Sequence, residues 1–415
     1  MDAFTYRHAE LACEALPMSV IADAVGTPAY VYSRAAILDA YTAYDRAFAG
    51  MPHVVCYAVK ANSNLGVLCT LAQAGAGADI VSGGELYRAL RAGIPPDKIV
   101  FSGVGKTPEE MREAVKADIL MFNVESAGEL AALDRVGAEM GMRVPIALRV
   151  NPDVDPQTHP YIATGLRSSK FGIPIAHALE MYERAARMPG IRIVGVQMHI
   201  GSQLTKTAPF VDATARLVGL VRSLRERRLE ITHVDIGGGL GIRYRDEVPP
   251  GPAEYAAVLL PALRELDVTL LLEPGRSVVG NAGALLTRVL YRKETETKTF
   301  IVVDAAMNDL IRPALYGAHH EIRPVTAGRA APRETVDVVG PVCESGDFLA
   351  RDREMPRVDE GDLLAVMSGG AYGFVQASNY NSRPRPPEVL VDGDRYAVVR
   401  RRETYQDLVL GEETS

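Results

Sequence analysis

The chain has 415 residues, of which 47% are hydrophobic, and a formal net charge of −7. A chain of this length and composition can bury a large core, and it predicts one large domain with a smaller one. The interspersed charges and acidic balance argue against a nucleic-acid partner, and the apolar runs are too short to span a membrane.

The N-terminus and the cysteines indicate a cytoplasmic protein. The opening residues MDAFTYRHAELACEAL lack a basic stretch followed by an apolar one, so we expect no signal peptide. The cysteines at positions 13, 56, 69 and 343 show neither CxxC spacing nor the density of a disulfide scaffold. We expect a reducing compartment and no metal site.

Short apolar, β-rich runs alternate with helical patterns over most of the chain. The helical patterns fill each gap between the runs and cover residues 65–74, 85–92, 109–116, 127–140, 176–188, 211–228 and 253–265. The runs themselves cover residues 53–59, 78–82, 99–103, 120–124, 144–150, 193–200, 233–236 and 268–273. Alternation of this kind predicts parallel strands, and eight of them favour a closed (β/α)8 TIM-type barrel over an open doubly wound sheet. We place this domain at residues 34–280, beginning with a helix at 34–48.

The pattern changes after about residue 281. Short alternating segments follow at residues 285–291, 298–303, 334–339, 362–366, 388–391 and 395–399. They predict a mostly antiparallel β domain at residues 281–415. Residues 1–33 join it through a strand at 27–33. We interpret residues 323–333 and 382–387 as loops, and the first of these has no role that the sequence reveals.

The segment VVCYAVKANSN, residues 54–64, reads as a buried strand with Lys60 at its carboxyl end. A buried lysine is rare, and burial lowers its pKa and makes it a candidate nucleophile for a Schiff base. A lone lysine at a strand end is more often an ordinary surface residue. Functional groups of a barrel lie at the carboxyl ends of its strands, so the other strand ends decide between these readings.

Polar side chains follow two other strands. Asp79, Ser82 and Glu85 surround the end of the second strand, and His199 ends the sixth, followed by Gly201 and Ser202. A lone histidine at a strand end is more often structural than functional. The backbone of Gly201 and the hydroxyl of Ser202 add an anion contact, which makes the two interpretations equally favoured.

The seventh strand runs into the glycine-rich segment DIGGGLGI, residues 235–242. Gly237, Gly238 and Gly239 let backbone N–H groups approach an anion closely, and a phosphate is the natural guest. A glycine-rich turn alone is weak evidence, because many are only tight turns. The segment is not the dinucleotide fingerprint in its usual context.

The eighth strand ends in LLLEPGRSVVG. Glu273 closes a strongly apolar strand, and a buried carboxylate needs a cation or hydrogen-bond donors. It either pairs with Arg276 or faces a protonated ring nitrogen while Arg276 faces an anion.

These parts fit pyridoxal 5'-phosphate, which needs a lysine for its aldehyde, a phosphate cradle and a partner for its pyridine nitrogen. A carboxylate partner keeps that nitrogen protonated and makes the ring a strong electron sink, which suits decarboxylation. An arginine partner would suit racemisation.

An ordered set of motifs carries a resemblance over roughly residues 27–387. YAVKAN, SKFGI, HIGSQ, DIGGGLGI, EPGR, VCESGD and GAYGF resemble segments of the diaminopimelate decarboxylases, which are fold-type III enzymes dependent on pyridoxal phosphate. The resemblance implies an alanine-racemase-like barrel with a β domain. It also implies decarboxylation of meso-2,6-diaminopimelate to L-lysine and CO2, the last step of lysine biosynthesis.

The resemblance also implies roles for individual residues. Lys60 would bond the cofactor, His199 would stack on its ring and Cys343 would return a proton. The remaining cofactor contacts would be Asp79, Ser202, Gly237, Gly238, Gly239, Glu273, Gly275, Arg276 and Tyr372. The substrate would meet Arg276, Arg312, Tyr316, Glu344 and Tyr372. Cys343 and Glu344 reach the pocket from the partner subunit in such enzymes, which implies a homodimer with shared active sites.

The charge pattern of the substrate supports the roles implied for the substrate-binding residues. Only one end of diaminopimelate is consumed, and the other needs an arginine for its carboxylate and an acid for its ammonium. Arg312, Tyr316 and Glu344 supply that set, whereas ornithine has no distal carboxylate. If these residues have no functional role, Cys343 is a small buried apolar residue and Arg312 caps a loop.

Several alternatives remain open. Another decarboxylase of this group would act on ornithine, arginine or carboxynorspermidine. An amino-acid racemase on a similar barrel is disfavoured by Glu273. A non-catalytic protein that binds pyridoxal phosphate would lack the second β domain that this chain is expected to have.

Overall fold

In a computed structural model, the protein is described at residues 2–155, 170–327 and 332–414. These residues divide into two units. One comprises Met1–Asp39, Arg243–Glu247 and Val279–Ser415, and the other comprises Ala40–Ile242 and Val248–Val278. We call them the β unit and the barrel unit and describe each by itself. The sequence places residues 34–39, 243–247 and 279–280 with the barrel, whereas here they cluster with the β unit.

Within the described residues of the barrel unit, eight parallel strands close on themselves through the pairing of β8 with β9. This arrangement confirms the predicted barrel. The strands are β5 (His53–Ala58), β6 (Gly77–Ile80), β7 (Ile99–Phe101), β8 (Met121–Val124), β9 (Val144–Asn151), β11 (Ile191–Met198), β12 (His233–Asp235) and β13 (Thr269–Leu272). A short segment that the sequence analysis missed, β10 (Ile173–Pro174), adds to β9.

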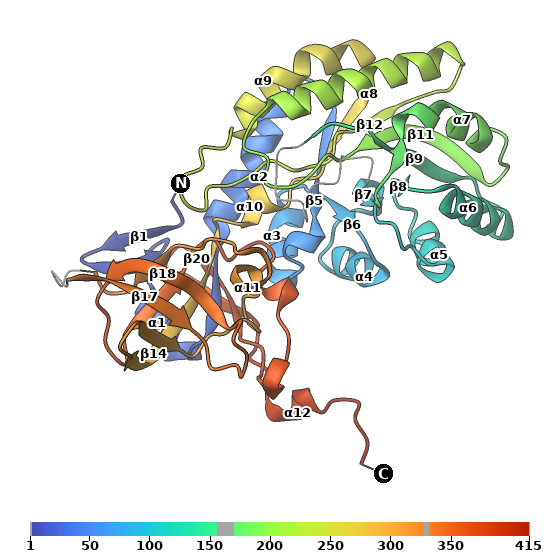
Figure 1. Ribbon diagram of the computed structural model, residues 1–415. Coiled ribbons are helices and arrows are strands. Elements are labelled where there is room, and N and C mark those ends of the chain that lie inside the picture. Colours follow the sequence, from blue (N-terminus) through green and yellow to red (C-terminus); the bar gives the residue numbers. More distant parts are fainter. Residues whose placement is uncertain (1, 156–169, 328–331, 415) are drawn as a thin grey trace. The chain divides into compact units, whose positions relative to one another are not determined.

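Helices follow the strands and lie outside them, as Figure 1 shows. They are α3 (Leu65–Gln73), α4 (Gly83–Arg91), α5 (Pro108–Lys116), α6 (Ala127–Met140), α7 (Ile175–Ala185), α8 (Ala208–Glu226) and α9 (Pro252–Leu263). Local sequence explains where several begin, because the side chains of Asn64, Ser82 and Ser126 accept backbone N–H bonds as N-caps. Helix α2 (Arg34–Phe48) precedes β5, and the short α10 (Arg276–Val279) follows β13.

The barrel strands are apolar because parallel strands covered by helices are buried on both faces. Cys56, Val100, Met121, Ala147 and Leu271 contribute to one buried cluster. Most of the polar groups of the site described below lie at or near the carboxyl ends of these strands. No helix of the described residues is long and apolar enough to cross a membrane.

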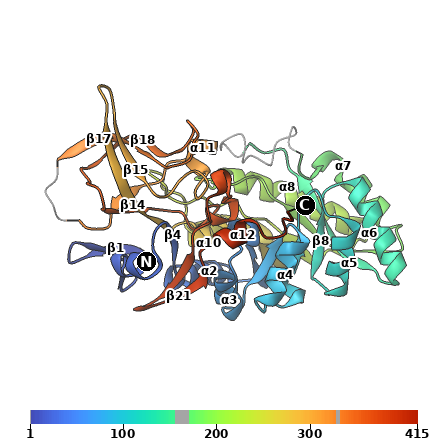
Figure 2. The same ribbon diagram turned by 90° about the horizontal axis from the view of Figure 1, so that it is seen from below.

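The β unit contains one main sheet in the order β18-β17-β15-β14-β4-β20-β21, and β19 pairs with β14 and β16. Its strands are β4 (Ala29–Ser33), β14 (Gly283–Glu294), β15 (Thr299–Val303), β16 (Ile322–Pro324), β17 (Arg333–Val339), β18 (Phe348–Pro356), β19 (Leu363–Val366), β20 (Glu388–Asp392) and β21 (Arg395–Arg400). Figure 2 shows β14, β15, β17 and β18 running beside one another. Most pairings are antiparallel, as predicted, and β15–β17 and β4–β20 are parallel.

Several elements of the β unit escaped the sequence analysis. Strand β18 has the sequence FLARDREMP, whose charged residues interrupt the apolar pattern expected of a strand. It lies at the end of the sheet order. Charged side chains are common on such edge strands because they prevent pairing with other chains. The N-terminal elements β1 (Phe4–Arg7), β2 (Glu10–Cys13), β3 (Leu16–Pro17) and α1 (Met18–Val25) were also missed.

Two segments from the sequence analysis lie partly outside the described residues. Residues 323–333 begin within β16 and end at the start of β17, and residues 328–331 are not described. The first residue of the SKFGI motif, at position 169, is not described either.

Candidate active site

Lys60 lies in the turn η1 (Val59–Ala61), directly after β5. Its Nζ is 2.5 Å from Oδ2 of Asp79, which is in β6 and fully buried. The lysine side chain keeps 36% of its surface exposed. Its amine is therefore held by a buried acid at the carboxyl end of the barrel while a small molecule can still reach it.

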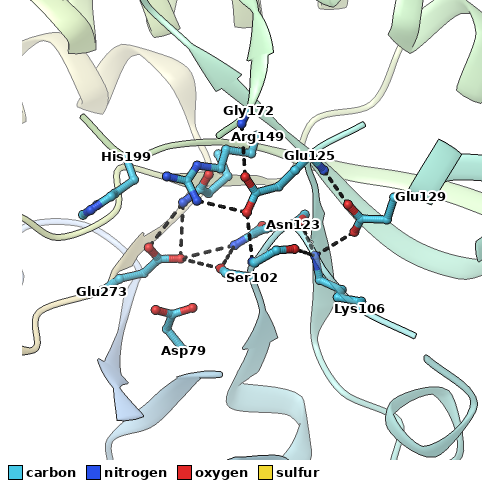
Figure 3. Close-up of polar contacts among 12 residues, drawn as sticks. Asp79, Ser102, Lys106, Asn123, Glu125, Glu129, Arg149, Gly172, His199 and Glu273 are labelled. Atoms are coloured by element: carbon cyan, nitrogen blue, oxygen red, sulfur yellow. Dashed lines mark hydrogen bonds and ion pairs between the residues drawn. The ribbon is translucent and has the colours of Figure 1, made fainter. Parts of the chain in front are cut away.

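Glu273 follows β13 and is buried, with 5% of its surface exposed. Its carboxyl oxygens accept from neutral groups: Asn123 Nδ2 at 3.2 Å, Gln197 Nε2 at 3.3 and 3.4 Å, and Ser102 Oγ at 3.4 Å. Figure 3 shows the amide of Asn123 and the hydroxyl of Ser102 directed toward Glu273. Burial raises the pKa of Glu273 well above its usual range, and the nearby carboxylates of Asp235 and Asp79 raise it further.

Asp235 ends β12 beside Glu273. Its Oδ1 accepts the backbone N–H of Gly237 at 2.8 Å, and its Oδ2 lies 3.3 Å from Asn123 Nδ2. Burial raises the pKa of Asp235 to about 6. Burial and the neighbouring carboxylate of Asp235 both favour the protonated form of Glu273.

The glycine-rich turn meets His199. The backbone N–H of Gly238 donates to His199 Nδ1 at 3.2 Å, so Nδ1 carries no proton. Burial, together with the charges of Arg149 and Lys60, lowers the pKa of His199 well below its usual range. His199 is consequently a neutral imidazole at physiological pH.

The turn itself requires glycine. Gly237 and Gly239 have φ angles of +68° and +111°. A Cβ at Gly238 would lie 2.1 Å from the carbonyl oxygen of Glu273. Glycine therefore lets the backbone of this turn approach its neighbours more closely than a residue with a Cβ atom could.

Arg276 and Ser202 complete the polar part of this site. Both Nε and Nη2 of Arg276 donate to Ser202 Oγ, at 3.4 and 3.1 Å. Arg276 is largely buried. Gly275 lies so close to Ala58 and Ala61 that an added Cβ would be 3.0 Å from each of their methyl groups.

A second buried network, which the sequence analysis missed, supports these strand ends. Lys106 is fully buried and donates to Glu129 Oε1 at 2.6 Å and to the backbone oxygens of Gly103 and Asn123. Glu125 accepts from Arg149 Nη1 at 3.0 Å and from the N–H of Gly103. Figure 3 shows these groups next to Asn123, so the network braces the strand that carries the amide bound to Glu273.

In the β unit, Arg312 and Tyr316 lie one turn apart on α11 (Arg312–Tyr316). The guanidinium carbon of Arg312 is 5.6 Å from the ring centre of Tyr316 and 5.2 Å from that of Tyr244. The contact with Tyr244 accounts for the clustering of residues 243–247 with the β unit.

The other expected residues of the β unit lie on irregular segments. Cys343 and Glu344 are exposed. The N–H of Cys343 donates to Asn381 Oδ1 at 2.7 Å, and Glu344 Oε2 accepts from the hydroxyl of Tyr380 at 3.1 Å. Tyr372 is half-buried and has a φ of +55°. Within the described residues, no cluster of histidine, cysteine, aspartate or glutamate side chains has the arrangement of a metal site.

Comparison with known proteins identifies the family. Residues 34–280 match the family described as pyridoxal-dependent decarboxylase, pyridoxal binding domain. Diaminopimelate decarboxylase from Pseudomonas aeruginosa is 59% identical and is matched over 99% of each chain. The chain belongs to the diaminopimelate decarboxylase family of pyridoxal-dependent enzymes. The predicted family, enzyme class and cofactor are thus confirmed.

Solved structures of diaminopimelate decarboxylases agree with this assignment. The M. jannaschii protein in co-complex with L-lysine has a TM-score of 0.95 and 39% identity, and the match covers 100% of this chain and 98% of that one. The Helicobacter pylori protein complexed with L-lysine has a TM-score of 0.92 and 43% identity, with coverage of 95% and 98%.

Proposed function

We propose that this chain decarboxylates meso-2,6-diaminopimelate to L-lysine and CO2, the last step of lysine biosynthesis. Glu273 is the observation that carries the proposal. It is a buried carboxyl group whose proton a pyridine nitrogen can take up, and neutral amides hold it in place. Such a partner makes the cofactor ring a strong electron sink, which is what loss of CO2 requires.

The barrel site fits pyridoxal 5'-phosphate in three respects. The amine of Lys60 is accessible and held by Asp79, where the cofactor aldehyde has to be bound. The turn at Gly237–Gly239 offers backbone N–H groups, and Ser202 with Arg276 adds a hydroxyl and a cation for a phosphate. Within the described residues, Oδ1 of buried Asp79 has no hydrogen-bond partner, which suits a site built to take a further group.

Each barrel residue then has a defined task. Lys60 would bind the aldehyde, Glu273 would hold or give up a proton at the pyridine nitrogen, and neutral His199 would lie against the ring. When bound, the cofactor supplies the electron sink for the carbon that loses CO2. His199 suits its place because its neutral ring adds no charge beside the cofactor.

We further propose that residues of the β unit bind the substrate. Arg312 and Tyr316 would bind the distal carboxylate and Glu344 the distal ammonium. Tyr372 and, from the barrel unit, Arg276 would also contact the substrate. Support comes from Arg312, which is 7% exposed and whose guanidinium lies near the rings of Tyr244 and Tyr316. A guanidinium buried to this extent needs an anion or hydrogen-bond acceptors to offset its desolvation.

The active enzyme is proposed to be a homodimer in which Cys343 and Glu344 act in the partner subunit's site, Cys343 as the proton donor. Support comes from the exposure of both side chains in this chain. Mixing inactive Lys60→Ala and Cys343→Ala proteins tests this proposal. If sites are shared, subunit exchange restores about a quarter of the wild-type activity, since one site in each mixed dimer is intact. Lack of any recovery despite exchange would overturn it.

We also propose a cytoplasmic location. All four cysteines lie within the described residues and are free thiols, which is typical of a reducing compartment.

The alternatives differ in the substrate's distal end and in the step catalysed. Ornithine and the other basic substrates named above would leave the distal carboxylate site without its partner. A racemase would need an arginine where Glu273 lies, and a non-catalytic carrier would bind the cofactor without turnover.

Release of CO2 by purified protein with added pyridoxal phosphate tests the proposal. The substrates to compare are meso-diaminopimelate, ornithine, arginine, carboxynorspermidine and lysine. Release from diaminopimelate alone is the expected result. Release from another substrate would refute the role of the distal site, and bound cofactor without any release would favour the carrier.

A further inference from the structure

Arg312 is fixed in place by its neighbours in the β unit. It begins the short helix α11, where Pro313 at the second position suits a helix start. The helix stops at Gly317, whose φ is +60°. The N–H of Ala318 then returns to the carbonyl oxygen of Arg312 at 3.3 Å. This turn brings His320 back against the arginine from which the helix started.

His320 contacts the guanidinium directly. Its Nε2 lies 3.3 Å from Nε of Arg312, and its Nδ1 lies 2.8 Å from the carbonyl oxygen of Met367. His320 has no exposed surface. It is a buried side chain with a hydrogen bond at each ring nitrogen, and none of the roles assigned above includes it.

The two partners determine the tautomer of His320. A guanidinium can only donate, so Nε2 must accept and carries no proton. A carbonyl oxygen can only accept, so Nδ1 must carry the proton and donate to Met367. The imidazole is therefore neutral and serves as a hydrogen-bond acceptor for a buried cation.

The backbone and ring of His320 are fixed as well. Its carbonyl oxygen accepts from Arg353 Nη1 of β18 at 2.8 Å. Its ring meets that of Tyr244 edge to face, with centres 5.4 Å apart and an interplanar angle of 78°. Tyr244 also lies against the guanidinium of Arg312. The rings of His320 and Tyr244 therefore fix both the direction of Arg312 Nε and the plane of its guanidinium.

We infer that His320 is a positioning residue that orients Arg312 to bind the distal carboxylate of the substrate. The inference rests on the proposed function, because it assumes that Arg312 binds that carboxylate. A carboxylate is bound best when the planar guanidinium presents a fixed edge to it. The hydrogen bond from Nε to His320 fixes the orientation of that plane.

Two substitutions separate the hydrogen bonds of His320. In His320→Asn the amide nitrogen takes the place of Nδ1, so the bond to Met367 is kept and the acceptor for Arg312 is lost. In His320→Gln the amide oxygen takes the place of Nε2, so the acceptor is kept. We expect KM for meso-diaminopimelate to rise about 10–30-fold in His320→Asn and less than about threefold in His320→Gln. The value of kcat should change little in either.

Ligand binding to the holoenzyme gives a second measurement. L-lysine retains the distal carboxylate, whereas cadaverine lacks it. Titration calorimetry should show weaker L-lysine binding in His320→Asn and unchanged cadaverine binding. His319→Asn is the matched control, because the neighbouring His319 contacts Arg353 at 3.2 Å and should leave both affinities unchanged.

The outcomes are distinct. Equal increases of KM in His320→Asn and His320→Gln would overturn the inference and leave His320 a structural residue. An equal loss of affinity for L-lysine and cadaverine in His320→Asn would do the same. Absence of CO2 release by the wild type would overturn the proposed function and this inference together. If His320→Asn fails to fold, 15N NMR of histidine-labelled wild-type protein decides, since a proton on Nε2 of His320 would also overturn it.

Discussion

Asp235 and Glu273 bind the same amide group: Asn123 Nδ2 lies 3.3 Å from the carboxyl oxygen Oδ2 of one and 3.2 Å from Oε1 of the other. Two acids this close in a buried site cannot both be ionised, because their repulsion is not screened by water. Burial raises the pKa of Glu273, and the carboxylates of Asp235 and Asp79 raise it further, so Glu273 favours its protonated form. The proton that it holds is the one that the proposed chemistry needs.

Replacing Glu273 with glutamine keeps its shape and removes its acidity. We expect kcat for CO2 release at saturating cofactor to fall about 100-fold or more, because an amide cannot hold a proton at the pyridine nitrogen. Glu139→Gln is a suitable control, because Glu139 is an exposed residue paired with Arg112. A kcat within about threefold of the wild type would contradict the role of Glu273.

Lys60→Ala removes the only amine proposed to bond the cofactor. Turnover should fall at least about a thousandfold, as is usual when a covalent catalyst is lost. Borohydride treatment should no longer attach the cofactor to the protein, as mass spectrometry can detect. Lys98→Ala is the control, because Lys98 Nζ donates to the backbone oxygen of Gly75 in an exposed pair. A Lys60→Ala protein that turns over at the wild-type rate would exclude Lys60.

Gly238→Ala tests the proposed phosphate turn. The added methyl group would lie 2.1 Å from the carbonyl oxygen of Glu273, so the turn must move. We expect the Kd for pyridoxal phosphate to rise about tenfold or more, measured by fluorescence titration of the apoenzyme. Gly219→Ala in α8 meets no atom within 4 Å and should leave that Kd unchanged. It should also raise the free energy of unfolding by up to about 1 kcal/mol. Equal Kd values for the two variants would argue against a role of this turn in binding the phosphate of the cofactor.

Asp309 makes the stability of the protein dependent on pH. Burial raises its pKa from 3.8 to about 7. The folded protein therefore binds a proton that the unfolded chain releases above about pH 4, so the free energy of unfolding falls as pH rises from about 4 to 7. Asp309 is 1% exposed. At pH 8 its ionisation should lower the free energy of unfolding by about 2–4 kcal/mol relative to pH 4.

Asp309→Asn should remove that pH dependence. The variant loses one accepted hydrogen bond, worth about 1 kcal/mol, so it should be more stable than the wild type at pH 8 and less stable at pH 5. Thermal unfolding at both pH values measures the difference. Parallel pH profiles for the two proteins would show that Asp309 is ionised in the fold.

The buried pair of Lys106 and Glu129 should be costly to break. Lys106→Met leaves the buried carboxylate of Glu129 without its cation and should lower the free energy of unfolding by about 3–5 kcal/mol. Adding Glu129→Gln neutralises that charge and should restore part of the loss. Urea unfolding of the single and double variants is the measurement, and additive losses would mean that the two residues are not coupled.

The strand ends of the barrel were predictable from sequence because apolar runs finish there in single polar residues. Lys60, His199 and Glu273 stand out for this reason, and the glycine-rich turn after β12 stands out by composition. The predicted alternation of strands and helices also gave the closed barrel, since the periodicity of each segment agrees with its final environment.

The partners of Glu273 were not predictable in the same way. Asn123 and Gln197 lie inside strands β8 and β11, and Ser102 follows β7, where each polar side chain has apolar neighbours in the sequence. Their contact with Glu273 exists only because the barrel closes and brings together residues up to 171 positions apart. His320 was hidden for another reason, because it contacts Arg312 only after the chain reverses at Gly317.

Reaction of meso-diaminopimelate in D2O tests the central claim most directly. We predict that CO2 is released and that the product is L-lysine with one deuterium on C6 and none on C2, as NMR can establish. That result shows that one end loses its carboxylate and gains a solvent proton while the other is held intact. Deuterium entering unreacted diaminopimelate without release of CO2 would instead show racemisation and would contradict the account.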